Sequence, residues 1–290
     1  MAPIVALLGF TGTVGSHLLP ELIEQNKQGN IRLIVLYREG SDLNKIPSDV
    51  EKREVQLDEA GLEKNKKAIE GVEVVVSSVG APGILSQNYL VDALAGSPSL
   101  KTFIHSDFGT NWTEEELKIP QLKSITVKED VVAHAKEKGV PLTHIRVGLF
   151  DLFFFKFKAA GTDIVDNKVS IYKQALTAPL RLTTLKFLGY AVAQLVTKPD
   201  TLPNQTFQVF DLTPTGQDIV DTLTKIHGKP AQIVQYTDED YHKGITEGFA
   251  IGAALQDKWG SDRWGASDRP EIKGWEYKSF EEHVRKALEQ

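Results

Sequence analysis

The sequence lacks cysteine altogether, and its 290 residues carry a formal net charge of −6. Without cysteine the chain has no disulfide bond, no thiolate nucleophile and no metal site built on thiolates. The acidic balance gives no indication of a nucleic-acid surface, and no apolar run approaches the length of a membrane-spanning helix. The chain begins directly with a strand-like run and shows no secretory signal. We therefore expect a cytoplasmic protein that binds neither nucleic acid nor membrane.

Several catalytic motifs are also absent. No tyrosine is followed by a lysine four residues later, so the Tyr-x-x-x-Lys pair of classical short-chain dehydrogenases is missing. The sequence has no G-x-S-x-G turn for a nucleophilic serine, and no His, Asp and Glu spacing typical of a metal site. We therefore expect no bound metal and no proton transfer that depends on tyrosine.

The N-terminal stretch combines a short apolar run with a glycine-rich turn. Residues 4–8 are apolar, a helix is predicted from Ser16 onwards, and Gly9, Gly12 and Gly15 stand between them. In a strand–turn–helix of this kind, the first glycine takes a tight turn, the second admits a pyrophosphate, and the third lets the helix pack on the strand. An ordinary glycine-rich turn is the alternative. The predicted cofactor contact includes the intervening residues Phe10, Thr11, Thr13 and Val14.

The end of the second predicted strand, residues 31–37, carries a basic residue where the adenosine ribose of a dinucleotide lies in this architecture. Arg38 is the first residue after the strand, and Lys45 follows shortly. An arginine here can pair with a 2′-phosphate through a charge-assisted fork, whereas an acidic residue accepts from a 2′-hydroxyl. Arg38, supported by Lys45, favours NADP(H) over NAD. The alternative is a solvated surface charge.

Three further strand ends supply candidate cofactor contacts. A short third strand is predicted at 55–58, which places Leu57 and Asp58 beside the adenine. The fourth strand, 72–79, and the fifth, 101–105, end in small or polar residues that allow close approach of a dinucleotide. Buried strand ends with satisfied hydroxyls would show the same residue types. The candidates are Ser77, Ser78, Val79 and Gly80 after the fourth strand, and Ser106, Asp107 and Phe108 after the fifth.

The alternation of strands and helices predicts an α/β fold, a Rossmann-type doubly wound parallel sheet with a smaller C-terminal substrate lobe. We expect residues 1–155, together with about 183–212, to form the NADP-binding domain. Residues 156–182 and 213–290 would form the substrate lobe. Further predicted elements are helices at 59–69, 86–95, 124–138, 183–196, 218–227 and 279–288, a mostly helical segment at 238–255, strands at 143–149 and 206–210, a short hairpin or loop at 163–172, and a loop at 259–269. That loop contains a near-repeat, W-G-S-D-R followed by W-G-A-S-D-R.

The order of these motifs resembles a known family. G-F-T-G-T-V-G, Y-R-E-G-S, S-S-V-G and H-S-D-F-G follow successive strands, and V-P-L-T and V-G-L-F come later. Together they resemble the NmrA-like branch of atypical short-chain dehydrogenases, in particular the isoflavone reductase and phenylcoumaran benzylic ether reductase group. The resemblance is specific over about the first half of the chain.

The resemblance implies a catalytic lysine. In that group the lysine lies a fixed distance before a G-[IV]-P segment, and Lys128 stands at that position relative to Gly139. The family assigns this lysine contact with the nicotinamide ribose and proton transfer. The chain departs from the family's P-S-E-F-G segment, since His105 replaces the proline and Asp107 the glutamate. It also has Leu188 where relatives carry an acidic residue before the following glycine. These changes bear on the substrate.

The chemistry of Lys128 depends on where its helix begins. Thr126 and Glu129 fit a capping box, which would place Lys128 in the first turn, although the helix could begin a few residues earlier. The positive end of the helix dipole and partial burial would then both lower the pKa of Lys128. A lowered pKa moves a lysine toward general-base action near neutral pH. A surface lysine on a solvated helix face is the alternative.

Aromatic side chains are the candidates for a substrate pocket. Trp112, Phe150, Phe153 and Phe154 could line it, although aromatic runs are also typical of a core. His105, at the end of the fifth strand, could relay a proton or form a structural hydrogen bond.

The sequence thus predicts an NADPH-dependent reductase of a small aromatic or phenolic molecule, with Lys128 as the proton-transfer residue. One alternative is a non-catalytic dinucleotide sensor that reports to a protein partner. Another is a redox-neutral isomerase, dehydratase or cyclase on the same scaffold. A homodimer is left open.

Overall fold

The computed structural model describes residues 1–289, which fall into two compact units. The first unit comprises residues 1–108, 124–145 and 188–207. The second comprises residues 109–123, 146–187 and the chain from 208 onwards. Residues 109–123 and 146–155 therefore cluster with the second unit, whereas the predicted functional boundary lies at 155.

A seven-stranded sheet forms the centre of the first unit, with the order β11-β6-β5-β4-β1-β2-β3. The order reverses beside β1, which pairs in parallel with β2 on one side and with β4 on the other. Such a reversal opens a crevice at the carboxyl ends of the strands, where open α/β sheets bind ligands. The strands are β1 (Ile4–Leu8), β2 (Arg32–Tyr37), β3 (Glu51–Glu54), β4 (Val74–Ser77), β5 (Thr102–Ile104), β6 (Leu142–Arg146) and β11 (Thr206–Gln208).

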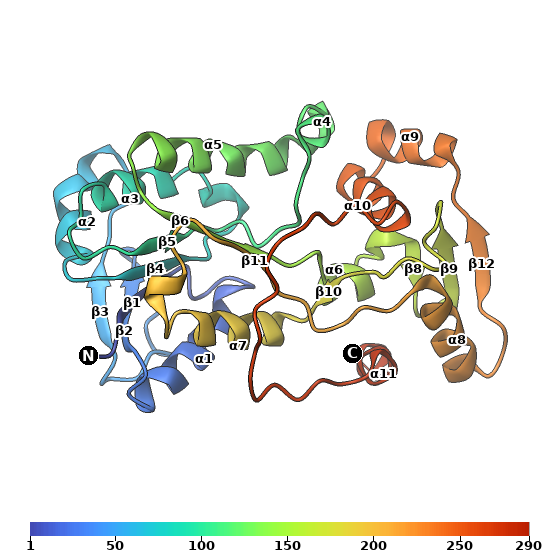
Figure 1. The fold of residues 1–290 in the computed structure, drawn as a ribbon, viewed down its shortest axis with the longest axis horizontal. Coiled ribbons are helices and arrows are strands. Elements are labelled where there is room, and N and C mark those ends of the chain that lie inside the picture. Colours follow the sequence, from blue (N-terminus) through green and yellow to red (C-terminus); the bar gives the residue numbers. More distant parts are fainter. Residues whose placement is uncertain (290) are drawn as a thin grey trace. The chain divides into compact units, whose positions relative to one another are not determined.

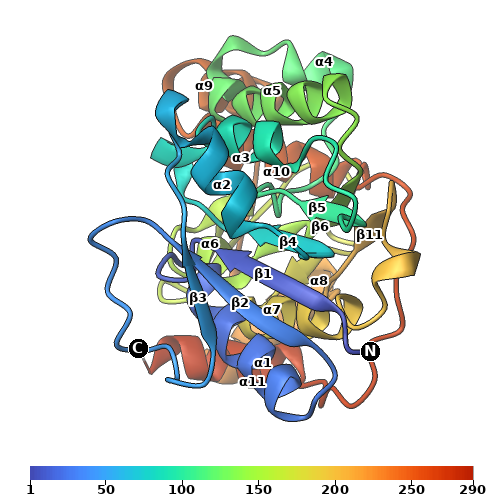
Figure 2. The same cartoon turned by 90° about the vertical axis from the view of Figure 1, so that its left-hand side faces the viewer.

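Helices cover both faces of this sheet (Figures 1 and 2). Helices α2 (Leu62–Ala68), α3 (Gln87–Leu94) and α5 (Lys123–Glu137) lie on one face, and α1 (Gly15–Lys27) and α7 (Leu185–Leu195) lie on the other. Helices α1 and α7 approach closely, because a Cβ on Gly189 would lie 2.2 Å from the carbonyl oxygen of His17. The predicted Rossmann-type α/β fold is confirmed.

The second unit contains two small sheets and its own core. Strand β7 (Leu149–Phe150) pairs in parallel with β10 (Leu182–Thr183). The predicted hairpin is formed by β8 (Thr162–Asp163) and β9 (Lys168–Ile171), and β12 (Gln232–Gln235) extends it. The helices are α4 (Glu114–Leu117), α6 (Asp151–Phe155), α8 (Gly216–His227), α9 (Asp238–Glu247), α10 (Ala250–Gly260) and α11 (Phe280–Leu288). Phe154, Trp259 and Trp264 are among the large side chains buried in the core.

Short 3₁₀ helices complete both units. They are η1 (Glu59–Gly61), η2 (Ala81–Gly83), η3 (Pro120–Leu122), η4 (Ala159–Gly161) and η5 (Pro199–Thr201). No helix in the described part of the chain is long and apolar enough to cross a membrane.

Four predicted elements need correction. The third strand is Glu51–Glu54, not 55–58, because an edge strand that pairs only with β2 can carry half-buried charged residues. Helix α5 begins at Lys123, so Thr126 lies inside the helix and is not its N-cap. The strand predicted at 143–149 is interrupted after Arg146. The loop predicted at 259–269 begins only after α10, which ends at Gly260.

Candidate functional site

The glycine turn after β1 leaves room at one of its three glycines. Gly9 has a φ of +86°, and a Cβ there would lie 2.6 Å from the carbonyl carbon of Ser78. A Cβ on Gly15 would lie 2.1 Å from the carbonyl oxygen of Gly9. At Gly12, by contrast, the nearest atoms to a Cβ are two carbonyl oxygens at 3.5 Å, an ordinary contact. Gly9 and Gly15 are thus required by the packing of the chain itself, whereas Gly12 is not.

The N-terminus of α1 also lacks a side-chain cap. Its N-cap residue, Val14, makes no capping hydrogen bond, and the first turn contains no acidic side chain. Helices α8, α9 and α11, in contrast, each begin with a complete capping box. The N–H groups of Ser16 and His17 already donate to the carbonyl oxygens of Gly12 and Val14, at 2.8 and 3.0 Å, whereas those of Thr13, Val14 and Gly15 have no backbone partner among the described residues. The helix dipole adds positive potential there. The turn therefore offers an anion these remaining donors and, at Gly12, space. These features fit the pyrophosphate of a dinucleotide.

Arg38 and Lys45 are exposed on the segment after β2. Neither side chain forms an ion pair within residues 1–289, whereas the nearby Arg32 and Arg53 both bind Glu51, at 2.6 and 2.7 Å. The Arg38 backbone is fixed, since its N–H donates to Ser41 Oγ at 3.2 Å. Both cations therefore remain available to an external phosphate.

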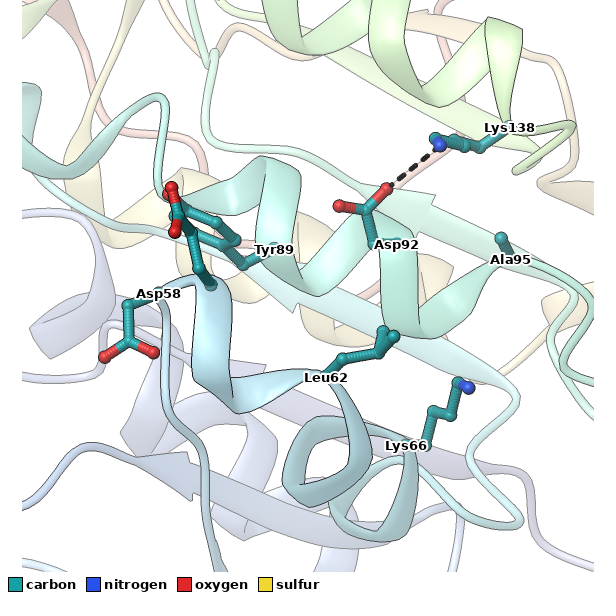
Figure 3. A pocket seen from close by; sticks show the side chains of 8 residues that line it. Asp58, Leu62, Lys66, Tyr89, Asp92, Ala95 and Lys138 are labelled. Atoms are coloured by element: carbon teal, nitrogen blue, oxygen red, sulfur yellow. Dashed lines mark ion pairs between the residues drawn. The ribbon is translucent and has the colours of Figure 1, made fainter.

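Leu57 is half-buried, and the carboxylate of Asp58 is engaged locally. Asp58 Oδ1 accepts from the N–H of Ala60 at 2.9 Å and so caps η1. Asp58 also lies at the rim of a groove of about 500 Å³ that is lined mainly by α2 and α3 (Figure 3). Lys138 closes part of this groove through an ion pair with Asp92 at 3.5 Å. The groove belongs to the helical layer and contains none of the glycine-turn residues.

The ends of β4 and β5 are tied to their neighbours by hydrogen bonds. Ser78 Oγ donates to the carbonyl oxygen of Leu8 at 2.9 Å, and Ser106 Oγ donates to that of Val79 at 2.9 Å. The N–H of Ser106 donates to Gln87 Oε1, also at 2.9 Å. Ser77 is fully buried, and Gly80 is exposed. The two hydroxyls thus fix the carboxyl ends of β4 and β5 beside the glycine turn. No sequence pattern had indicated Gln87, an ordinary residue in the first turn of α3.

Lys128 and Asp107 form a half-buried ion pair. Lys128 Nζ donates to the backbone oxygen of Asp107 at 2.7 Å and to its Oδ1 at 3.1 Å. The Lys128 side chain is 24% exposed and that of Asp107 is 4% exposed. Burial lowers the pKa of Lys128 to about 8, although the negative charge of Glu129 opposes this shift. Because Lys128 is the sixth residue of α5, burial replaces the helix dipole as the cause.

The backbone beside this ion pair is strained. Phe108 has a φ of +39°, in the left-handed region that side chains rarely adopt. The Phe108 ring is buried.

His105 makes a contact that the sequence did not indicate. Its Nε2 lies 3.0 Å from Nδ1 of His144 on β6, the neighbouring strand. The two rings meet edge to face, with centroids 5.0 Å apart. Burial lowers the pKa of His144, so a single shared proton fits this pair better than two imidazolium charges.

The four aromatic candidates belong to the second unit and differ in exposure. Phe154 is fully buried and meets Phe155 and Phe280 edge to face, which is a core position. Phe153 is 41% exposed, and Phe150 is half-buried in β7. Phe154 is therefore a core residue, whereas Phe150 and Phe153 have exposed surface that a ligand could contact.

Trp112 is held by a buried ion pair. Lys258 Nζ lies 5.0 Å from the centre of the Trp112 ring, and it donates to both oxygens of Glu116, at 2.9 and 2.8 Å. The Lys258 side chain is completely buried, and burial lowers its pKa. Because 142 residues separate the partners in sequence, no local pattern could have revealed this pair.

The strand order, the glycine turn and the strand ends that meet beside it define an α/β protein of the Rossmann type. The chain belongs to the NmrA-like family, whose sequence profile matches residues 1–282. No group of three or more His, Asp or Glu within the described residues could hold a metal ion.

Individual relatives are distant. Phenylcoumaran benzylic ether reductase POP1 of Populus trichocarpa is 26% identical over 161 residues, which cover 53% of this chain and 51% of that protein. Isoeugenol synthase 1 of Clarkia breweri is 28% identical over 122 residues, 38% of each chain. The matched part of the chain thus spans about half of the first of these relatives and less of the second. The structure of AtPrR2 with NADP⁺ and (+)pinoresinol superposes with a TM-score of 0.79 at 18% identity, over 99% of both chains. The predicted relationship to the isoflavone reductase and phenylcoumaran benzylic ether reductase group is confirmed.

Proposed function

We propose that this protein is an NADPH-dependent reductase of a small aromatic or phenolic molecule. The half-buried lysine with a lowered pKa, Lys128, carries the proposal. Relatives of this chain include reductases of aromatic ethers, and AtPrR2 has been solved with NADP⁺ and an aromatic ligand. When bound, the cofactor supplies the hydride, and the residues of this chain bind it, orient it and move a proton.

In this proposal the glycine turn and two basic residues hold the phosphates. The uncapped start of α1 and the space at Gly12 receive the pyrophosphate. Arg38, with Lys45, binds the 2′-phosphate, which NADP(H) has and NAD lacks. The absence of an internal ion pair at Arg38, among the residues described, supports this assignment.

Lys128 would act as the proton donor in the direction of reduction. With a pKa of about 8, Lys128 is protonated in most molecules at neutral pH and neutral in about one in ten. The lysine can therefore give up a proton to an oxygen that gains negative charge, and recover it from solvent. Asp107 fixes the position of Nζ through its backbone oxygen and its carboxylate.

A non-catalytic dinucleotide sensor is the second candidate. The hydrogen bonds between Lys128 and Asp107 would also be present if the lysine only joined α5 to the end of β5. A sensor would bind NADP(H) through the same turn and would need no proton donor.

One assay separates the two candidates. NADPH oxidation, followed by its absorbance, is measured against a panel of aromatic ketones, enones and benzylic ethers, with wild type and Lys128→Ala side by side. Turnover by wild type that is lost in Lys128→Ala supports the reductase. Tight NADPH binding without turnover of any panel compound supports the sensor. Equal turnover by both proteins contradicts the assigned role of Lys128.

A further inference from the structure

The near-repeat at 259–269 is anchored twice in the same way. The Nε1–H of Trp259 donates to the carbonyl oxygen of Ala178 at 2.9 Å, and that of Trp264 donates to the carbonyl oxygen of Pro179 at 3.1 Å. Both rings are buried in the second unit. The two copies of the motif therefore dock side by side on consecutive peptide groups of one segment.

The arginines that end the two copies have different surroundings. Arg263 forms an ion pair with Asp257, which also binds Lys173, and lies 4.0 Å from Glu116. Arg269, in contrast, meets no carboxylate among the described residues. Its guanidinium lies over the ring of Phe210 at 4.1 Å, and its terminal N–H donates to the Phe210 carbonyl oxygen at 3.2 Å. The second copy thus carries a cation without an internal counter-ion.

A second unpaired guanidinium shares the same ring. Arg181 lies 5.5 Å from the centre of Phe210. One terminal nitrogen of Arg181 donates to the carbonyl oxygen of Gly265 at 3.3 Å and to the side chain of Gln208. Burial lowers the pKa of Arg181, and the positive charge of Arg269 lowers it further. Both cations therefore contact one aromatic ring, and neither forms an ion pair with a carboxylate among the described residues.

Three aspartates close to these residues in sequence or in space do not form ion pairs with either arginine within the described residues. Asp262 attracts Arg181 through space but forms no ion pair with it. Asp268 contributes its backbone oxygen to the N–H of Gln208, at 2.8 Å. The Asp211 carboxylate is bound to Thr184, through the backbone N–H at 2.8 Å and the hydroxyl at 2.7 Å. The charge of the two guanidiniums is thus left for a ligand to balance.

We propose that Arg181 and Arg269, aligned by Phe210, form a binding site for a phosphate monoester group. A guanidinium presents five N–H donors in a planar fork, and the hydrogen bonds within residues 1–289 use only a few of them. A phosphate monoester carries a charge of about −1.5 to −2 at neutral pH and three acceptor oxygens, which suits two forks. A carboxylate carries one charge and two oxygens, and it would balance only one of the two cations. The site uses none of the residues assigned to the dinucleotide.

The side chains themselves can report the binding. The Nε–H signals of the arginines are recorded by ¹H–¹⁵N NMR on the full chain and assigned from Arg181→Gln and Arg269→Gln. Inorganic phosphate is then titrated in at constant ionic strength. We expect the signals of Arg181 and Arg269 to shift together and to saturate. In each single variant, the signal of the remaining arginine should report phosphate binding at least about tenfold weaker than in wild type, because one charge-assisted contact is lost.

Three comparisons make the test specific. Arg285→Gln removes the same charge from an exposed ion pair with Glu281, and it should leave the affinity unchanged. Phenyl phosphate should bind as well as inorganic phosphate if the site takes a monoester, and benzoate should bind distinctly more weakly. Phosphate bound at the glycine turn would move the Arg38 signal and not these two.

Other outcomes would overturn the proposal. They are a shift that grows linearly without saturation, an equal loss of affinity in Arg285→Gln, or benzoate binding as tight as phosphate. Because the wild-type titration observes Arg181 and Arg269 directly, poor folding of a variant does not remove the test. It needs neither NADPH nor a substrate, so its failure is distinct from failure of the reductase proposal.

Discussion

Gly12→Val should remove dinucleotide binding while leaving the protein folded. The first Cβ contacts at Gly12 are oxygens at 3.5 Å, so the free energy of unfolding should change by less than about 1 kcal/mol. The added methyl groups would occupy the space proposed for the pyrophosphate. We expect NADPH affinity to fall by about 100-fold or more, which corresponds to roughly 2.7 kcal/mol.

Gly15→Ala is the matched control. Its Cβ would lie 2.1 Å from the Gly9 carbonyl oxygen, so the backbone must shift. Overpacking of this kind typically costs about 1–3 kcal/mol. Urea denaturation followed by circular dichroism measures stability, and titration of NADPH fluorescence measures binding. A folded Gly12→Val protein that binds NADPH like wild type would refute the assignment of the phosphates to this turn. Full stability of Gly15→Ala would refute the packing argument.

Four further predictions concern charged groups. Arg38→Ala should weaken NADPH binding about tenfold or more and leave NADH binding unchanged in parallel titrations, and an unaltered cofactor preference would contradict the 2′-phosphate contact. Lys128→Ala should lower kcat about 10²–10⁴-fold, and Lys128→Arg should restore little, because a guanidinium does not release its proton. In pH profiles of reduction, the wild-type rate should fall above about pH 8 as Lys128 loses its proton. If the residual rate of Lys128→Ala shows the same fall, the titration belongs to another group. Lys258→Met should lower the free energy of unfolding by roughly 3 kcal/mol, since buried Glu116 then loses the ammonium that contacts both of its oxygens and keeps only Arg263 at 4.0 Å. A loss below ~1 kcal/mol in urea denaturation would show that the pair is not structurally important.

The sequence predicted those parts of the fold in which local pattern and burial agree. Strands β1, β2 and β4 are apolar over nearly their whole length, and the glycines stand between an apolar strand and a helix, the position that gives their spacing its meaning. Strand β3 was misplaced because its residues are all charged and half-buried, so no apolar pattern marks it. The start of α5 was predicted to within one residue, but η3 leads directly into the helix, so the apparent capping box at Thr126 is internal.

The site was accessible to sequence reasoning only in part. Resemblance to relatives singled out Lys128, but its hydrogen bonds to Asp107, 21 residues earlier, depend on how α5 packs beside β5. The different exposures of Phe153 and Phe154 depend on the orientation of one short helix, which composition does not determine. The assigned site residues and the functional domain boundaries remain predictions.

The charged edge strand β3 also bears on how copies of this protein can meet. Its outer edge carries backbone groups that another strand could join, and an exposed edge of this kind is a template for aggregation. Glu51 is held by Arg32 and Arg53, and Glu54 by Lys64 at 2.8 Å, so an incoming strand would have to bury or displace these ion pairs. Strand β3 therefore disfavours continuation of the sheet into a second molecule. If the protein forms a dimer, we expect its interface elsewhere.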